Sequence, residues 1–183
     1  MSSSIIKIKP VISKADRKIF IKLIWDIYKD DPSWVPPIIM ERMAAIDPNK
    51  NPYFEHAKVK LWIAYKDGNP VGRISAQIDE LVSINHGINT GHYGYFDCIN
   101  NKEVANALFD TACCWLRENG MIEVIGPFSL SINEETGLLV EGFDTPPMLL
   151  MGHSRPYFEN LVLGTGLKKI KDTWAYRLDI KKP

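Results

Sequence analysis

The sequence predicts a single α/β (α+β) domain over residues 1–183, with a mixed central sheet and helices on both of its faces. The chain has 183 residues, of which 45% are hydrophobic and 24% charged, as expected of one globular domain with its own core. Two alternating segments flank a turn at Asp67, Gly68 and Asn69. Further on, a helical pattern lies between two apolar runs, which is the order of a crossover between parallel strands.

The first fifty residues predict a strand and two helices. Residues 5–11 alternate apolar and basic side chains, as a half-buried strand does. Apolar residues recur at helical spacing over residues 15–29, and Ser13 has the position of an N-cap. The proline-rich run 31–37 ends this helix, and residues 38–45 predict a second one.

The middle of the chain predicts most of the sheet. Residues 58–65 and 71–79 are expected to form a hairpin around Gly68, which tolerates positive φ. The second of these strands has an apolar face and a polar face, and the polar face carries Arg73. That polar face either lines a site or meets solvent. A loop is expected over residues 81–90.

A crossover unit follows this loop. Residues 92–99 predict a strand rich in aromatic side chains, and residues 121–126 predict a short apolar strand. Between them, Asn100 or Asn101 is expected to cap a helix over residues 102–119. Because such crossovers join parallel neighbours, the two strands are expected to run parallel.

The last third of the chain is less regular. Glycines and a polar patch interrupt residues 128–144, and the apolar run 148–151 is a candidate strand. Pro156 suits the first turn of a helix over residues 156–163. Residues 168–180 alternate again and predict one or two closing strands.

Charge and composition argue against several classes of function. Lys and Arg number 22 and Asp and Glu number 22, so the net charge of zero disfavours a nucleic-acid partner. Cys98, Cys113 and Cys114 have neither disulfide nor metal-ligand spacing, so we expect no metal and a reducing compartment. No run approaches the ~20 apolar residues of a membrane helix, and the start lacks a signal core. We therefore expect a cytoplasmic protein with no membrane partner.

Five motifs and the order of the predicted elements carry a resemblance to a known family. The motifs lie at residues 34–37, 47–57, 71–74, 126–135 and 137–144. Together they resemble a little-characterised bacterial branch of the GNAT acyltransferase superfamily. Members of that branch are longer, so the chain is expected to be a short version or a piece of a longer protein.

The resemblance implies that acetyl-CoA or another acyl-CoA binds where the strands 92–99 and 121–126 separate. In the superfamily, the pyrophosphate lies on the N-terminus of the helix between these strands, where free N–H groups attract anions. The cofactor-binding residues implied here are Cys98, Ile99, Asn100, Asn101 and Lys102. The superfamily's glycine loop is missing, and Glu103 would oppose a phosphate. We therefore expect weak acetyl-CoA binding that Lys102→Glu weakens further.

The resemblance also implies catalytic residues for transfer to an amine, which needs a base and a donor for the thiolate. Asp97 lies on the strand that carries the base in many members, although a strand-end carboxylate can also cap a loop. Tyr157 opens the helix that often supplies the acid, but the family spacing is not matched, so a packing role competes. His56, His86, His92 and His153 are scattered and predict no Ser-His-Asp triad.

A polar cluster in the motif at 126–135 is the remaining candidate. Ser131 and Asn133 are predicted to bind substrate with Arg73, and Glu134 to take part in catalysis. Asn133 and Glu134 are therefore expected to face a cleft near the strand ends. The alternative is ordinary turn hydrogen bonding by the Ser and Asn side chains.

The sequence thus predicts an acyl-CoA-dependent N-acyltransferase that acts on a small-molecule or peptide amine. Two alternatives stay open. One is a non-catalytic ligand-binding module that keeps the fold without the transfer chemistry. The other is a fragment whose site needs a second half or a partner chain, and a homodimer is also left open.

Overall fold

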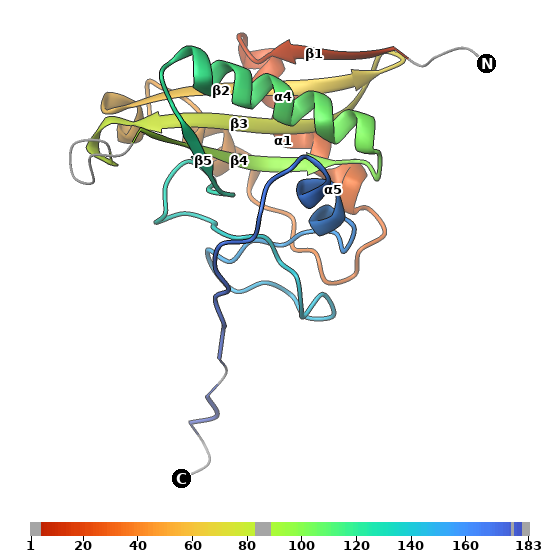
Figure 1. The fold of residues 1–183 in the computed structure, drawn as a ribbon. Coiled ribbons are helices and arrows are strands. Elements are labelled where there is room, and N and C mark those ends of the chain that lie inside the picture. Colours follow the sequence, from red (N-terminus) through yellow and green to blue (C-terminus); the bar gives the residue numbers. More distant parts are fainter. Residues whose placement is uncertain (1–4, 83–88, 177, 181–183) are drawn as a thin grey trace.

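The computed structural model describes residues 5–82, 89–176 and 178–180 (Figure 1). Most of the loop predicted at 81–90, including His86, lies outside these residues. The helices and strands, in chain order, are β1 (Ile6–Pro10), α1 (Lys14–Tyr28), α2 (Ile39–Ala45), the 3-10 turn η1 (Pro52–Glu55), β2 (Ala57–Lys66), β3 (Asn69–Asp79), β4 (Thr90–Cys98), α4 (Lys102–Glu118), β5 (Glu123–Ile125) and α5 (Phe158–Gly164).

Five strands form one mixed sheet in the order β1-β2-β3-β4-β5. The first four pair antiparallel, and β5 pairs parallel to β4. The hairpin between β2 and β3 turns at Asp67 and Gly68, which both have positive φ, as the tight primed turns require. The predicted hairpin and the predicted parallel crossover are both confirmed.

Helices cover both faces of the sheet, as the sequence predicted. Figure 1 shows α4 in front of the sheet and α1 behind it. Alternate residues of β3 face the two helices. Ile74 and Ala76 pack in the core with α4, and Gly72 lies so close to Leu108 that a Cβ there would come within 2.9 Å of it. Arg73 points the other way and donates to the carbonyl of Phe20 in α1.

Both long helices begin with side-chain caps. Ser13 and Asp16 form a capping box on α1, in which each side chain bonds the other's backbone N–H. Asn101 caps α4 by accepting from the N–H of Val104 at 3.0 Å. Both helices also bury an apolar stripe, so packing and capping agree on the residue at which each helix begins.

The predicted closing strands are wrong. Within residues 168–176 and 178–180 the structure contains no strand, and this segment leaves the domain as an extended tail (Figure 1). Its apolar side chains stay outside the core, and Tyr176 is 90% exposed. Alternation marks a chain that can pair, but a strand also needs a neighbouring strand to bond. Likewise, only Met151 of residues 148–151 forms a bridge, with Thr136.

The two short helices differ slightly from their predicted bounds. α2 begins at Ile39, and α5 begins at Phe158 with Tyr157 in the N-cap position. Among the described residues, no helix combines the length and apolar character needed to cross a membrane.

Candidate functional site

A bulge in β4 changes which side chains face each helix. The register shifts between the pairs Arg73–Asp97 and Ser75–Gly94, so β4 carries one more residue there than β3. Tyr95 takes a φ of 46° at this point. As a result, Phe96 packs in the core with α4, whereas Tyr95 and Asp97 lie on the α1 side.

Beyond the bulge, β4 and β5 no longer pair. Their parallel register ends at His92 and Ile125. The chain after β5 crosses the sheet instead: Phe128 donates its N–H to the carbonyl of Tyr93, and Gln77 donates to the carbonyl of Phe128. At Gly94 a Cβ would lie 1.6 Å from the Phe128 oxygen, so only glycine allows this crossing.

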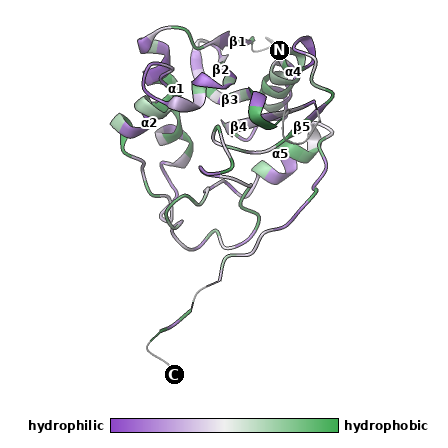
Figure 2. Cartoon of the chain, turned by 90° about the vertical axis from the view of Figure 1, so that its left-hand side faces the viewer, coloured by the Kyte–Doolittle hydropathy of each residue, from purple (hydrophilic) through white to green (hydrophobic). Residues whose placement is uncertain are grey.

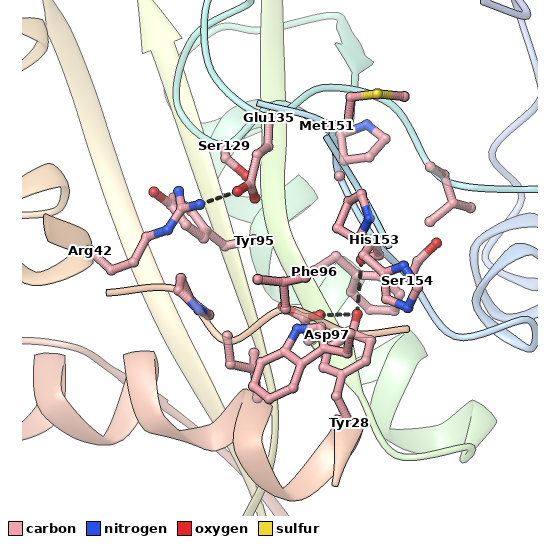
Figure 3. A pocket seen from close by; sticks show the side chains of 18 of the residues that line it. Tyr28, Arg42, Tyr95, Phe96, Asp97, Ser129, Glu135, Met151, His153 and Ser154 are labelled. Carbon is pink, nitrogen blue, oxygen red and sulfur yellow. Dashed lines mark hydrogen bonds and ion pairs between the residues drawn. The ribbon is translucent and has the colours of Figure 1, made fainter. Parts of the chain in front are cut away.

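A cavity of about 110 Å³ lies where the two strands have separated (Figure 3). β4 contributes Tyr95, Phe96 and Asp97, and the segment after β5 contributes Pro127 and Ser129. The rest of the wall comes from α1, α2, β3, residues 135–138, the loop before α2 and the loop before α5. Sites for whole drug-sized ligands hold roughly 300–1,000 Å³. This cavity therefore suits the reacting ends of substrates rather than a whole acyl-CoA.

A buried ion pair forms the floor of the cavity. Arg73 donates to Asp97 through Nε at 2.8 Å, and Tyr28 donates its hydroxyl to the other carboxylate oxygen at 2.7 Å. The Arg73 guanidinium also lies over the rings of Phe20 and Tyr95. Burial and the neighbouring charge of Asp97 raise the pKa of Tyr28 well above its usual value, so Tyr28 stays a donor at neutral pH.

A second ion pair joins α2 to the segment after β5. Arg42 contacts the carboxylate of Glu135, and both line the cavity (Figure 3). Burial works to lower the pKa of Arg42, but the charge of Glu135 and the nearby Tyr95 raise it above its usual value. Burial also raises the pKa of Tyr95. Arg42 therefore stays protonated across the physiological range.

A third polar group connects the loop after α1 to the loop before α5. Asp31 lies 3.0 Å from Nε2 of His153 and 3.4 Å from a guanidinium nitrogen of Arg155. Burial works to raise the pKa of Asp31, but hydrogen bonds from His153 and Ser33 lower it below its usual value. Tyr28 donates to the backbone carbonyl of His153, which ties this group to the floor of the cavity.

Exposed apolar residues adjoin cavity-lining residues in the sequence, on two loops and at the start of α2. Figures 1 and 2 show these loops, one between α1 and α2 and one before α5, on the same side of the sheet. Val35 and Pro37 of the first loop line the cavity, as do Pro147 and Met151 of the second. We call the exposed side chains beside them the apolar rim. Its members are Val35, Ile38, Met40, Met148, Leu149 and Leu150.

A second cavity, of about 220 Å³, lies between β5, α5 and residues 168–173. It shares Pro127, Gly137 and Leu138 with the first. Its lining mixes apolar side chains such as Val162 with lysines of the tail.

Of the sequence-predicted site residues, Asp97 and Arg73 line the first cavity together. The predicted cofactor residues lie elsewhere, at the connection from β4 to α4. Cys98 is buried, and burial raises its thiol pKa, while Asn100 and Lys102 are exposed. Ile99 donates its N–H to the carbonyl of Val71. None of residues 98–102 lines either cavity.

Tyr157 lies beside the same connection. Its hydroxyl donates to the carbonyl of Cys98 at 2.9 Å, and its ring packs on Phe158. Burial raises the pKa of Tyr157 to about 12, so the phenol remains protonated at neutral pH. It lines neither cavity.

The predicted orientation of Asn133 and Glu134 toward a cleft is wrong. Both residues are exposed and line neither cavity. Ser131 accepts a hydrogen bond from the N–H of Asn133 at 3.2 Å, so the turn alternative describes this cluster. Because of this turn, Glu135 and not Glu134 contacts Arg42.

Sequence reasoning missed most of the cavity wall. Tyr28 fits the apolar stripe of α1, and His153 precedes a helix with no motif around it, so neither had a local signal. Glu135 lay next to a predicted residue, but its pairing depends on a helix far away in sequence. Among the described residues, no cluster of three or more His, Cys, Asp or Glu side chains could hold a metal.

Comparison with curated proteins finds two bacterial relatives, whereas no family model matches. A bacterial ceramide synthase of Caulobacter vibrioides is 47% identical over 171 residues, which cover 93% of this chain and 44% of that protein. Protein YghO of Escherichia coli is 42% identical over 176 residues, which cover 94% of this chain and 45% of its own length. The chain thus spans less than half the length of the curated relatives it matches.

Comparison with solved structures identifies the fold. A tandem GNAT protein from the clavulanic acid pathway has a TM-score of 0.56 at 12% identity, over 88% of this chain and 43% of that one. An aminoglycoside acetyltransferase from a soil metagenome, in complex with sisomicin, has a TM-score of 0.56 at 13% identity, over 95% and 97%. An aminoglycoside N-acetyltransferase in complex with CoA has a TM-score of 0.55 at 13% identity, over 97% of both chains.

Proposed function

Because the chain has the GNAT fold, we propose that it carries the transfer site of an acyl-CoA-dependent N-acyltransferase. The observation that carries the proposal is the first cavity. It lies where β4 and β5 separate, which is where the resemblance to the superfamily expects the acyl thioester. Its lining combines the buried charges of Arg73 and Asp97 with apolar side chains of the loops before α2 and α5.

We further propose that the acceptor is a long-chain amine. The apolar rim supports this, because several exposed apolar side chains close in sequence to cavity-lining residues suit an interaction site. Leu149 is 91% exposed, Met40 77% and Met148 72%, and a small polar substrate gains nothing from such a surface. The name of the Caulobacter relative, a ceramide synthase, agrees with an amine that carries an aliphatic chain.

The reaction that fits such a site forms one bond and breaks one. The nitrogen of a neutral amine attacks the thioester carbonyl, and the tetrahedral intermediate expels the CoA thiolate. A base takes one proton from the nitrogen, and the thiolate receives one proton from an acid or from water. Because alkylamines have pKa values near 10, as lysine does, a base is needed at neutral pH.

Different groups would serve different parts of this reaction. Asp97 already accepts from Arg73 and Tyr28, so we assign it to holding the floor in place. Arg42 and Glu135 would bind the polar head of the acceptor through charge-assisted hydrogen bonds. Tyr157 stays protonated but lies outside both cavities and donates to the carbonyl of Cys98, so it would serve the departing sulfur only after releasing that bond.

The start of α4 would hold the phosphates of the acyl-CoA. Helix starts offer N–H groups without intrahelical partners, and the exposed Lys102 adds a positive charge. The side chain of Asn101 already occupies the N–H of Val104, and no glycine opens the loop. These residues fit a phosphate, but with fewer backbone donors than a glycine loop offers.

The apolar rim gives a direct test of the acceptor. We expect Leu149→Ser with Met40→Ser to raise KM for a long-chain amino alcohol about 10-fold, since each buried CH₂ is worth about 0.8 kcal/mol. KM for a short amino alcohol should not change. The matched control is Ile12→Ser with Ile122→Ser, which alters equally exposed apolar residues outside the rim.

Three results would count against the proposal. Equal effects of both double variants would remove the rim from substrate binding. Equal use of short and long amines would show that the acceptor has no chain to recognise. Octanoyl-CoA binding without transfer to any amine would favour the non-catalytic module.

A further inference from the structure

His153 is the buried titratable side chain of the first cavity whose hydrogen bonding is incomplete. Its side chain is 4% exposed, and that of its partner Asp31 is 11% exposed. Nε2 lies 3.0 Å from the Asp31 carboxylate, whereas Nδ1 is buried with no partner among the described residues. Buried polar atoms without partners are rare in proteins, and a catalytic role is one explanation for them; Nε of the neighbouring Arg155 is a second such atom. Figure 3 shows His153 between Met151 and Tyr28 at the cavity wall.

The pairing with Asp31 sets the tautomer of the neutral imidazole. A carboxylate only accepts hydrogen bonds, so Nε2 carries the proton and donates it to Asp31. Nδ1 then holds a lone pair without a partner, on a residue that lines the cavity. An imidazole oriented by a carboxylate, with its second nitrogen free, has the arrangement of a general base.

Asp31 is itself held firmly in place. Its second carboxylate oxygen accepts from the N–H of Ser33 at 3.0 Å, and its own N–H donates to the carbonyl of Tyr28. Trp34 follows in the same turn and stacks on the Tyr28 ring at 5.3 Å. The orientation of His153 therefore does not depend on a flexible side chain.

We propose that His153 is the general base that takes the proton from the acceptor amine, and that Asp31 is its positioning residue. The inference rests on the proposed function and adds the proton acceptor that it lacked. Nδ1 accepts the proton as the C–N bond forms, and the resulting imidazolium keeps its hydrogen bond to Asp31. The proton leaves to water after the amide product departs.

The other carboxylates of the cavity are less suited to this role. Both oxygens of Asp97 are occupied by Arg73 and Tyr28. Glu135 is held by Arg42. A base that must first release a strong donor is slower than one with a free lone pair.

Several charged and titratable groups lie near the His153 ring. The Asp31 carboxylate lies 3.0 Å from Nε2 of His153, and Arg155 lies 3.4 Å from the same carboxylate. Tyr28 faces the ring and carries no charge at neutral pH. The Arg73–Asp97 pair lies beyond Tyr28 and is balanced. Two opposite charges thus act on the ring at close range.

The test compares His153→Gln with His56→Gln. His56 makes a similar contact, 3.0 Å to Asp79, but lies outside both cavities, so it is a matched control. Transfer from octanoyl-CoA to a long-chain amino alcohol would be followed across pH 5 to 9. We expect H153Q to lower kcat about 10²- to 10⁴-fold and to remove the acidic limb of kcat/KM. H56Q should match wild type in rate and pH profile, and octanoyl-CoA affinity should stay unchanged in both.

Two additions make the result decisive. Asp31→Asn should lower kcat by less than H153Q, with KM unchanged. Imidazole should restore part of the rate of His153→Ala, because the cavity adjoins the vacated ring. An H153Q variant as active as wild type, with the same pH profile, would overturn the inference while leaving the proposed function intact. Wild type without transfer would instead overturn the proposed function, and His153 as its base with it.

Discussion

The two faces of β3 are both buried but differ in chemistry. On the α4 side, Ile74 and Ala76 are buried among apolar side chains. On the α1 side, Arg73, Ser75 and Gln77 are just as buried, and each makes hydrogen bonds. The α4-side face is buried by close packing of apolar side chains. On the α1-side face each buried polar group has a hydrogen-bond partner. These hydrogen bonds are costly to break, and they hold the functional groups in place.

The largest expected effect tests the polar face. Asp97→Asn leaves the buried Arg73 charge without its partner, so the free energy of unfolding should fall by about 3–5 kcal/mol. Urea unfolding followed by circular dichroism measures this change. The double variant Arg73→Met with Asp97→Leu removes both charges and should recover most of the loss. If D97N is as stable as wild type, the ion pair does not hold the floor together.

The next effect tests the apolar face. Leu108 of α4 is fully buried against the sheet, so Leu108→Ala should lower the free energy of unfolding by roughly 2–5 kcal/mol through lost burial and a cavity. Under conditions where the variant is folded, octanoyl-CoA affinity should match wild type. A clear loss of affinity at full folding would show that the α4 face also shapes the site.

A third prediction concerns pH and the polar group outside the sheet. The folded-state pKa of Asp31 lies below its ordinary value of 3.8, so the stability it contributes is present above that value. It is lost as the pH falls through the lower, folded-state pKa. Asp31→Asn should therefore be less stable than wild type at pH 7, by roughly 1.5–3 kcal/mol for a charged hydrogen bond.

Stability at low pH separates a loss of the Asp31 charge from a general packing defect. The gap between wild type and D31N should narrow as the pH falls below 3.8, as thermal unfolding at several pH values would show. A gap of constant size would mean that the asparagine disturbs packing rather than charge.

The smallest expected stability effect lies at the start of α4. Asn101→Gly removes the cap from Val104 and should cost only a few tenths of a kcal/mol, because glycine is a tolerated N-cap. It also frees a backbone donor, so calorimetry should find tighter acyl-CoA binding. Lys102→Glu should weaken binding. If neither substitution changes the affinity for acyl-CoA, the phosphates bind elsewhere.

The sequence predicted the fold well because the fold follows from local patterns. The alternation around Gly68, the caps at Ser13 and Asn101, and the crossover each act within a few residues. The closing strands failed for a different reason. Residues 168–180 have the alternation of a strand, but pairing depends on a neighbour that no local pattern describes.

The candidate site was harder to predict because its contacts are distant in sequence. Asp97 and Arg73 could be named, since they lie on strands with a recognisable polar face. Tyr28 and His153 are 125 positions apart and meet only after folding. Glu134 and Glu135 look equivalent in sequence, and the turn at Ser131 decides which one reaches Arg42.

The central claim is that the polar, α1-side face of the sheet holds the acyl-transfer site. Nuclear magnetic resonance of the 20.8 kDa chain, titrated with octanoyl-CoA, tests it most directly. If this face holds the site, the backbone amides of Tyr95, Asp97 and Ser129 at the cavity should shift, as should that of Lys102 at the start of α4. Shifts confined to the far end of α4, near Trp115, or no shifts at millimolar octanoyl-CoA, would contradict it.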